Sequence, residues 1–211
     1  MGERLQRLGS SLVSSFYLQS PERPLGWALG FSVLFVLLWQ INTLVSPFFD
    51  VVPDRVSLVF LPAFARVVAV VVAGGAGVLG IFLGSLIIGL AVVGDTMTVA
   101  LTNALSSALA PVLAYWLLRR LGTSDFVRGD GLTWSSFMLL TVLCGLMNAL
   151  VHGAVWSGQQ AMSQSLLNLV SMTIGDLVGV VLCLSLVKCL VVICPGCMRQ
   201  LLGWLARRAT A

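Results

Sequence analysis

Arg66 and Asp176 are ionisable residues of opposite charge that lie inside apolar segments of this 211-residue chain. Each lies ten residues from the predicted outer end of its segment, which corresponds to a depth of roughly 15 Å at helical rise. Charged groups in hydrocarbon are costly and usually face a bundle interior or a wet cavity. We therefore predict that the two side chains pair. The pair could only fix the register of two helices, or it could form the floor of a ligand or ion site.

Further polar residues accompany this pair in the outer halves of neighbouring apolar runs. Asn148 and His152 are four residues apart, which places them on one helix face. A single histidine near a helix end is more often an interfacial hydrogen-bonding residue than a ligand group, so the prediction depends on the whole cluster. Asn168 also lies near an outer helix end. The predicted ligand-binding residues are Arg66, Asp176, Asn148, His152, Asn103 and Asp95. Together they predict an outward-facing pocket for a small polar or anionic ligand, with Arg66 as its counter-charge.

Cysteine and histidine offer little further chemistry. Cys194 and Cys197 form a Cys-x-x-Cys pair, whose spacing suits a redox couple or half of a zinc site completed by a second chain. One such pair is a weak metal candidate. The sequence has a single histidine, no pair of carboxylates on a common helix face and no serine in a nucleophile elbow. We therefore expect no catalytic residues, no enzyme activity and no cofactor.

Composition places these residues in a membrane. Hydrophobic residues make up 58% of the chain and charged residues only 9%, whereas soluble domains have about 25% charged residues. A soluble enzyme or a nucleic-acid-binding protein of this composition would lack a polar surface. The formal net charge of +4 comes from basic residues beside apolar runs, where membrane topology explains them better than a nucleic-acid partner. The sequence predicts an all-α, polytopic membrane helix bundle whose first partner is the lipid bilayer.

Six apolar runs are candidates for membrane-spanning helices, since about 20 residues cross roughly 30 Å of hydrocarbon. They cover residues 25–46, 56–73, 77–93, 98–118, 134–156 and 166–193. The second and third are short and are separated by only three residues, so they could form a tight helical hairpin or one irregular re-entrant unit. We favour the hairpin, because six crossings place both termini and nearly all basic residues on the cytoplasmic side.

Short amphipathic segments flank the predicted transmembrane domain of residues 25–193. Apolar residues recur at helical spacing beside arginines in residues 1–24 and again in residues 194–211. Both segments could lie on the inner leaflet as helices or could be frayed polar tails. The connections between spans leave no room for a soluble domain. We therefore expect the protein to act through a partner protein on the cytoplasmic side or within the membrane.

Several short motifs resemble the first MASE type of membrane-associated sensor domain. The motifs are Phe-Leu-Pro-Ala-Phe-Ala at 60–65, Leu-Gly-Ser at 83–85, Leu-Leu-Arg-Arg-Leu-Gly at 117–122, and Gly-Asp-x-x-Gly at 175–179. The last of these is the most specific, and together they cover about 90 residues. The resemblance implies a multi-helix sensor of the bacterial inner membrane. Members of that family usually continue into a cytoplasmic diguanylate cyclase or kinase module, and Arg66 stands where an apolar or small residue is expected.

The overall plan is also similar to the substrate-binding components of energy-coupling factor transporters. Those proteins have about six helices, both termini inside and a vitamin-sized pocket near the outer face. They also present small residues where the energising subunit docks. Ala65, Ala69 and Ala73 recur at four-residue spacing and could serve in that way, or could be plain packing.

The sequence therefore predicts an inner-membrane protein that acts by recognition. A sensor or scaffold in signal transduction is the first interpretation, because the Gly-Asp-x-x-Gly motif at 175–179 is the most specific match. A substrate-binding component of an energy-coupled transport system is the alternative. A structural subunit of a membrane complex is a third.

Overall fold

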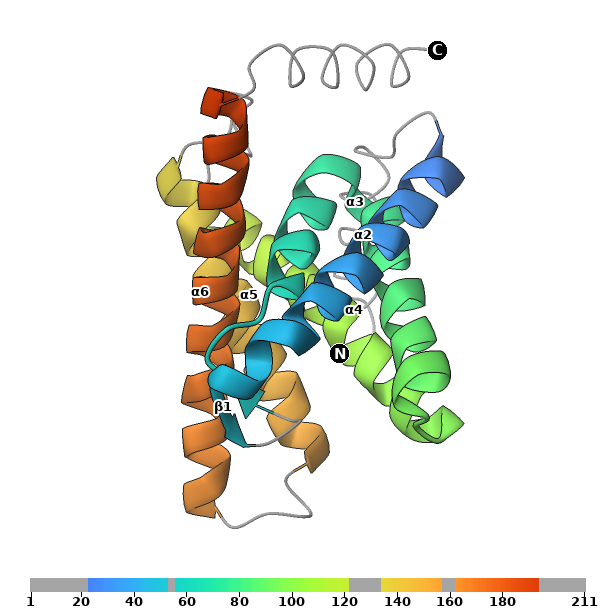
Figure 1. Ribbon diagram of the computed structural model, residues 1–211, viewed down its shortest axis with the longest axis vertical. Coiled ribbons are helices and arrows are strands. Elements are labelled where there is room, and N and C mark those ends of the chain that lie inside the picture. Colours follow the sequence, from blue (N-terminus) through green and yellow to red (C-terminus); the bar gives the residue numbers. More distant parts are fainter. Residues whose placement is uncertain (1–22, 53–55, 122–133, 157–161, 194–211) are drawn as a thin grey trace.

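The computed structural model describes residues 23–52, 56–121, 134–156 and 162–193, which form a helical bundle (Figure 1). The helices are α2 (Pro24–Val45), α3 (Pro62–Ile87), α4 (Met97–Leu121), α5 (Trp134–Trp156) and α6 (Met162–Ile193). The last turns of the α3 segment continue as a π-helix, η2 (Ile88–Val93). Between α2 and α3 lie a 3-10 turn, η1 (Ser46–Phe48), and two short antiparallel strands, β1 (Asp50–Val52) and β2 (Val56–Ser57).

Five segments of the described chain are long and apolar enough to cross a membrane. Their outer surfaces are apolar as well: Leu25, Leu29 and Leu37 of α2 are all more than half exposed. A contiguous leucine face of this kind would be unfavourable in water, but lipid tails are as apolar as leucine. The architecture fits a multi-pass helical membrane protein, as composition predicts.

Most predicted helix boundaries lie within a few residues of the observed ones, and 134–156 coincides with α5. The prediction that residues 56–73 form one continuous helix is wrong at its amino-terminal end. Residues 56–57 form β2, residues 58–60 are irregular, and α3 begins only at Pro62. Proline has no amide hydrogen to donate and its fixed φ suits the first helical turn, so it marks the start of the helix.

The α3 segment reverses direction at Gly74. This residue has φ 50° and ψ −127°, a backbone conformation outside the helical region that glycine adopts readily. A Cβ added at Gly77 would overlap the carbonyl oxygen of Ala69, so the two arms lie against each other. Figure 1 shows the teal ribbon folding back at this point. Both the helical hairpin and the re-entrant unit require this fold-back, so the preference for a spanning hairpin stays a prediction.

The two hairpin arms join without an intervening loop. Residues 62–93 therefore count as a single apolar segment, and the described chain has five such segments rather than the six predicted. Because the two arms run in opposite directions, this difference concerns how helices are counted and does not contradict the hairpin.

Both hairpin arms pack on α2. A Cβ at Gly80 would overlap the carbonyl oxygen of Ala28, so the second arm touches the backbone of α2. On the first arm, Ala65, Ala69 and Ala73 are fully buried in a cluster that contains two phenylalanines of α2. This alanine stripe is internal packing, and the alternative that it forms a docking surface for a partner is wrong.

The non-helical residues before α3 lie directly against α6. Gly175 and Gly179 share one face of α6, and a Cβ on either would overlap a carbonyl oxygen of this non-helical segment, that of Ser57 or Phe60. The Phe60 amide donates to the Gly175 carbonyl over 3.0 Å. The next amide, that of Leu61, donates to Oδ1 of Asn42 on α2 over 2.8 Å. An irregular backbone at membrane depth needs such partners, because lipid supplies none.

This contact predicts that Gly179→Ala destabilises the protein. The added methyl group would meet backbone atoms that cannot rotate away, and we expect a loss of about 1–3 kcal/mol. Thermal unfolding of the purified protein in mild detergent measures the change. Gly30→Ala on α2 is the matched control, because a Cβ there meets nothing within 4 Å. Equal stability of the two variants would contradict the direct contact with α6.

Candidate functional site

Arg66 and Asp176 form a buried ion pair, as their predicted depth indicates. Arg66 Nη2 donates to Asp176 Oδ1 over 2.8 Å, and the two side chains are only 1% and 5% exposed. Arg66 lies early in α3 and Asp176 near the middle of α6. Pro62 places the start of α3 beside α6, so the fold brings together two residues that are 110 positions apart.

Asn148 of α5 completes the coordination of the carboxylate. Its Nδ2 donates to Asp176 Oδ2 over 3.2 Å, so each carboxylate oxygen has a donor. Gly145, about one turn before Asn148, lies close to α6: a Cβ there would be 3.3 Å from Cβ of Asp176. His152 lies one turn after Asn148, with Nδ1 3.0 Å from the Asn148 carbonyl oxygen. Because a carbonyl only accepts, Nδ1 is the nitrogen that carries the hydrogen.

The Arg66 guanidinium is not fully satisfied by these neighbours. Its Nε and Nη1 are buried and have no hydrogen-bond partner among the residues that the structure describes. One face of the group lies over the Phe60 ring, with Cζ 4.9 Å from the ring centroid, which is a cation–π contact. Leaving a buried donor unpaired costs about 1–3 kcal/mol.

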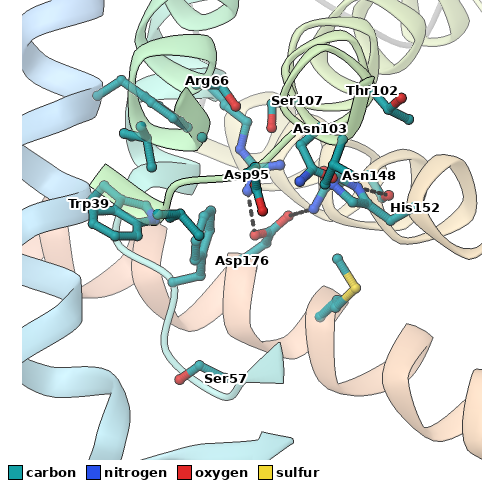
Figure 2. Close-up of a pocket in the computed structure, with 18 of the residues that line it drawn as sticks. Trp39, Ser57, Arg66, Asp95, Thr102, Asn103, Ser107, Asn148, His152 and Asp176 are labelled. Carbon is teal, nitrogen blue, oxygen red and sulfur yellow. Dashed lines mark hydrogen bonds and ion pairs between the residues drawn. The ribbon is translucent and has the colours of Figure 1, made fainter. Parts of the chain in front are cut away.

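Arg66 is among the residues that line a cavity of about 760 Å³ (Figure 2). The cavity is lined by all six predicted site residues: Arg66, Asp176, Asn148, His152, Asn103 and Asp95. They come from α3, α4, α5, α6 and the turn after η2. Their assembly around one space is observed, and their role in ligand binding stays a prediction. Ligand cavities of roughly 300–1,000 Å³ are typical for small molecules.

Asp95 is held by a constrained turn at the edge of this group. Gly94 has φ 79°, and the Asp95 amide donates to the Gly89 carbonyl over 2.8 Å. Gly89 belongs to the π-helical turn η2 and itself lines the cavity. Short π-helical segments are frequent at functional sites. The carboxylate is half-buried, so it is partly shielded from water.

Sequence reasoning missed several cavity residues. The missed polar residues are Ser57, Ser85, Thr98, Thr102 and Ser107, and Phe35, Trp39 and Phe60 add aromatic walls. A signal for the α4 residues was present, because Thr98 and Thr102, and likewise Asn103 and Ser107, are four residues apart. No comparable signal exists for Phe60, whose position depends on the non-helical segment beside α6.

Two other predictions need comment. Asn168 is buried and is not among the residues that line the cavity, so its place in the polar region stays a prediction. Cys194 and Cys197 lie outside the described residues. Within the described ranges, no group of three or more histidine, cysteine, aspartate or glutamate side chains could hold a metal ion.

The ion pair predicts a specific pattern in a charge-swap experiment. Arg66→Asp or Asp176→Arg alone leaves two like charges buried together, and we expect each to cost at least about 3–5 kcal/mol and to prevent folding. The double variant restores opposite charges and should recover part of the folded yield, measured by monodispersity in mild detergent. A double variant as damaged as the worse single variant would contradict the pairing.

The chain matches no protein-family model, no curated protein and no solved structure. The geometry of the cavity therefore carries the functional argument.

Proposed function

We propose that this protein is a membrane recognition protein that binds a small polar ligand in the cavity above the Arg66–Asp176 pair and acts through a partner protein. The observation that carries this proposal is a buried arginine that lines a cavity of about 760 Å³ and whose Nε and Nη1 have no partner among the described residues. A buried charge at membrane depth that also faces a cavity is typical of a functional site.

Six membrane crossings are part of this proposal. Along α2, the two hairpin arms, α4, α5 and α6, the described chain runs back and forth between the two ends of the bundle (Figure 1). The first arm, residues 62–73, is about 18 Å long at helical rise. The residues 56–61 that precede this arm add at most ~20 Å, which is the span of six fully extended residues. Together they reach across a hydrocarbon core of about 30 Å.

The described basic residues support a cytoplasmic location for both termini. Arg23 precedes α2, Arg119 and Arg120 lie in the last turn of α4, and Lys188 lies near the end of α6. All four are exposed, and these helix ends lie at the same end of the bundle (Figure 1). By the positive-inside rule that end is cytoplasmic. Ser57 and Asp95, in connections at the opposite end, then give the cavity an outward opening in a bacterial inner membrane.

A sensor or scaffold is the first candidate for the partner-dependent role. The resemblance to the first MASE type rests mainly on the Gly-Asp-x-x-Gly motif. Each of the three named residues of this motif has a physical role in this fold. Gly175 and Gly179 admit the non-helical segment that precedes α3, and Asp176 binds Arg66. Asp176 of this motif therefore lines the cavity. A ligand bound there would change the packing between α3 and α6.

A substrate-binding transport component is the second candidate, favoured by a cavity of small-molecule size. It differs from the first in its consequences. A transport component delivers its ligand across the bilayer only with a partner ATPase, whereas a sensor alters the activity of its partner while the ligand stays outside. Uptake of the bound ligand by cells that hold the partner, compared with cells that lack it, distinguishes the two.

The double variant Arg66→Met with Asp176→Leu tests the proposed function. Replacing a buried ion pair by apolar residues of similar size is often neutral for folding. We expect a folded, monodisperse protein that no longer gains thermal stability from the metabolites that stabilise the wild type. Thr141→Val, which removes a buried hydroxyl that does not line the cavity, controls for the loss of a polar group in the core.

Two results would contradict the proposal. One is a folded apolar double variant that retains full ligand response, since the pair would then only fix helix register. The other is a wild type that no metabolite stabilises but that co-purifies in fixed ratio with other membrane proteins. That second result would identify the structural subunit of a complex.

A further inference from the structure

The charges around the cavity do not suit a simple anion. Among the residues that line it, Arg66 is the one cation, whereas Asp176 and Asp95 are both carboxylates. The Arg66 charge is already compensated by Asp176 at 2.8 Å. The lining therefore carries one formal negative charge in excess, and a phosphate or other dianion would meet net repulsion.

Arg66, one of the residues that line the cavity, nevertheless has unpartnered hydrogen-bond donors that suit a carboxylate. Nε and Nη1 of Arg66 have no partner among the described residues, and the guanidinium is 1% exposed. Nε and Nη1 lie on different edges of the guanidinium, so a ligand carboxylate can accept a hydrogen bond from either one of them. The Asp176 carboxylate occupies only Nη2.

Asn148, which also lines the cavity, has an unpartnered hydrogen-bond acceptor. Asn148 must direct Nδ2 toward Asp176, because a carboxylate only accepts hydrogen bonds. Its Oδ1 then points elsewhere, is buried, and has no partner within the described part of the chain. A ligand that offered acceptors alone would leave this oxygen unsatisfied. The best-matched ligand carries hydrogen-bond donors as well as a carboxylate.

Asp95 supplies the charge that selects those donors. It lines the same cavity and is half-buried, and the hydrogen bond from its amide to Gly89 fixes the turn that carries it. A partly shielded carboxylate that no described basic side chain neutralises favours a cationic group on the ligand.

We propose that the ligand is a small zwitterion that carries both a carboxylate and an ammonium group, as free amino acids and short peptides do. Arg66 binds the carboxylate, Asn148 Oδ1 accepts a hydrogen bond from a donor close to it, and Asp95 attracts the ammonium group. The inference rests on the proposed function and specifies its ligand. The cavity volume of about 760 Å³ admits either source.

Binding to the full-length protein in lipid nanodiscs tests this inference. The probes are a panel of common amino acids and of di- and tripeptides. Each is compared with the carboxylic acid that lacks its ammonium group and with the amine that lacks its carboxylate, for example leucine with isocaproate and isoamylamine. Inorganic phosphate and sucrose complete the panel. Equilibrium binding is measured for the wild type and for Asp95→Asn and Asp95→Glu.

We expect one zwitterion to bind at least tenfold more tightly than either of its truncated analogues, and the amino acid and peptide arms identify its source. Loss of a partly exposed charge contact should make Asp95→Asn bind that zwitterion roughly five- to tenfold more weakly. The same change should leave the affinity for its carboxylic acid analogue unchanged or higher. Asp95→Glu keeps the charge and should stay close to the wild type.

Other outcomes overturn the inference and separate it from the proposed function. Equal or tighter binding of phosphate, sucrose or a carboxylic acid analogue contradicts the zwitterion and leaves ligand recognition standing. An Asp95→Asn variant with wild-type preference for the zwitterion contradicts the role of Asp95. Failure of every probe to bind the folded wild type contradicts the inference, whereas the ligand response of the apolar double variant tests the proposed function separately.

Discussion

The ion pair between Arg66 and Asp176 is the constraint on which the centre of this structure depends. In a bundle surrounded by lipid, neither charge can be left without a partner, because the hydrocarbon offers no hydrogen bonds and little screening. The pair therefore ties α3 to α6, and Asn148 brings α5 to the same carboxylate. The helix α3 is distant in sequence from α5 and α6, yet all three meet at this polar contact, and a cavity adjoins it.

A second constraint comes from the backbone before α3. Residues 57–60 are non-helical and lie beside the middle of α6, where their amides and carbonyls need partners within the protein. Glycines on α6 allow this segment to approach, and Asn42 and Gly175 accept hydrogen bonds from it. The consequence is that α3 starts inside the bundle, with Arg66 only about one turn from that start. Helix packing and site geometry thus have a common origin in the Gly-Asp-x-x-Gly motif.

Much of this arrangement could be predicted because its causes are local or depend on a single variable. Hydropathy and length define α2, α4, α5 and α6, since lipid requires long apolar helices. The depth of a residue in the membrane also follows simply from residue count. The matched depths of Arg66 and Asp176 predicted that the two pair, and this prediction is confirmed. The positive φ of Gly74 accounts for the fold-back of the α3 segment, whereas the choice between a spanning hairpin and a re-entrant unit depends on its depth in the membrane and stays a prediction. Asn168, in contrast, was placed by depth alone, and depth does not say which way a helix face points.

By itself the sequence determined a multi-pass helical membrane protein, the main helices, and a short set of polar residues at one depth. These properties follow from composition, period and length, which need no knowledge of neighbours. Tertiary structure alone decided that Ala65, Ala69 and Ala73 face α2, that residues 56–60 leave the helix, and that Phe60 covers the Arg66 guanidinium. It also decided which donors stay open. The rotation of each helix about its axis controls these features, and that rotation is set by packing between segments far apart in the chain.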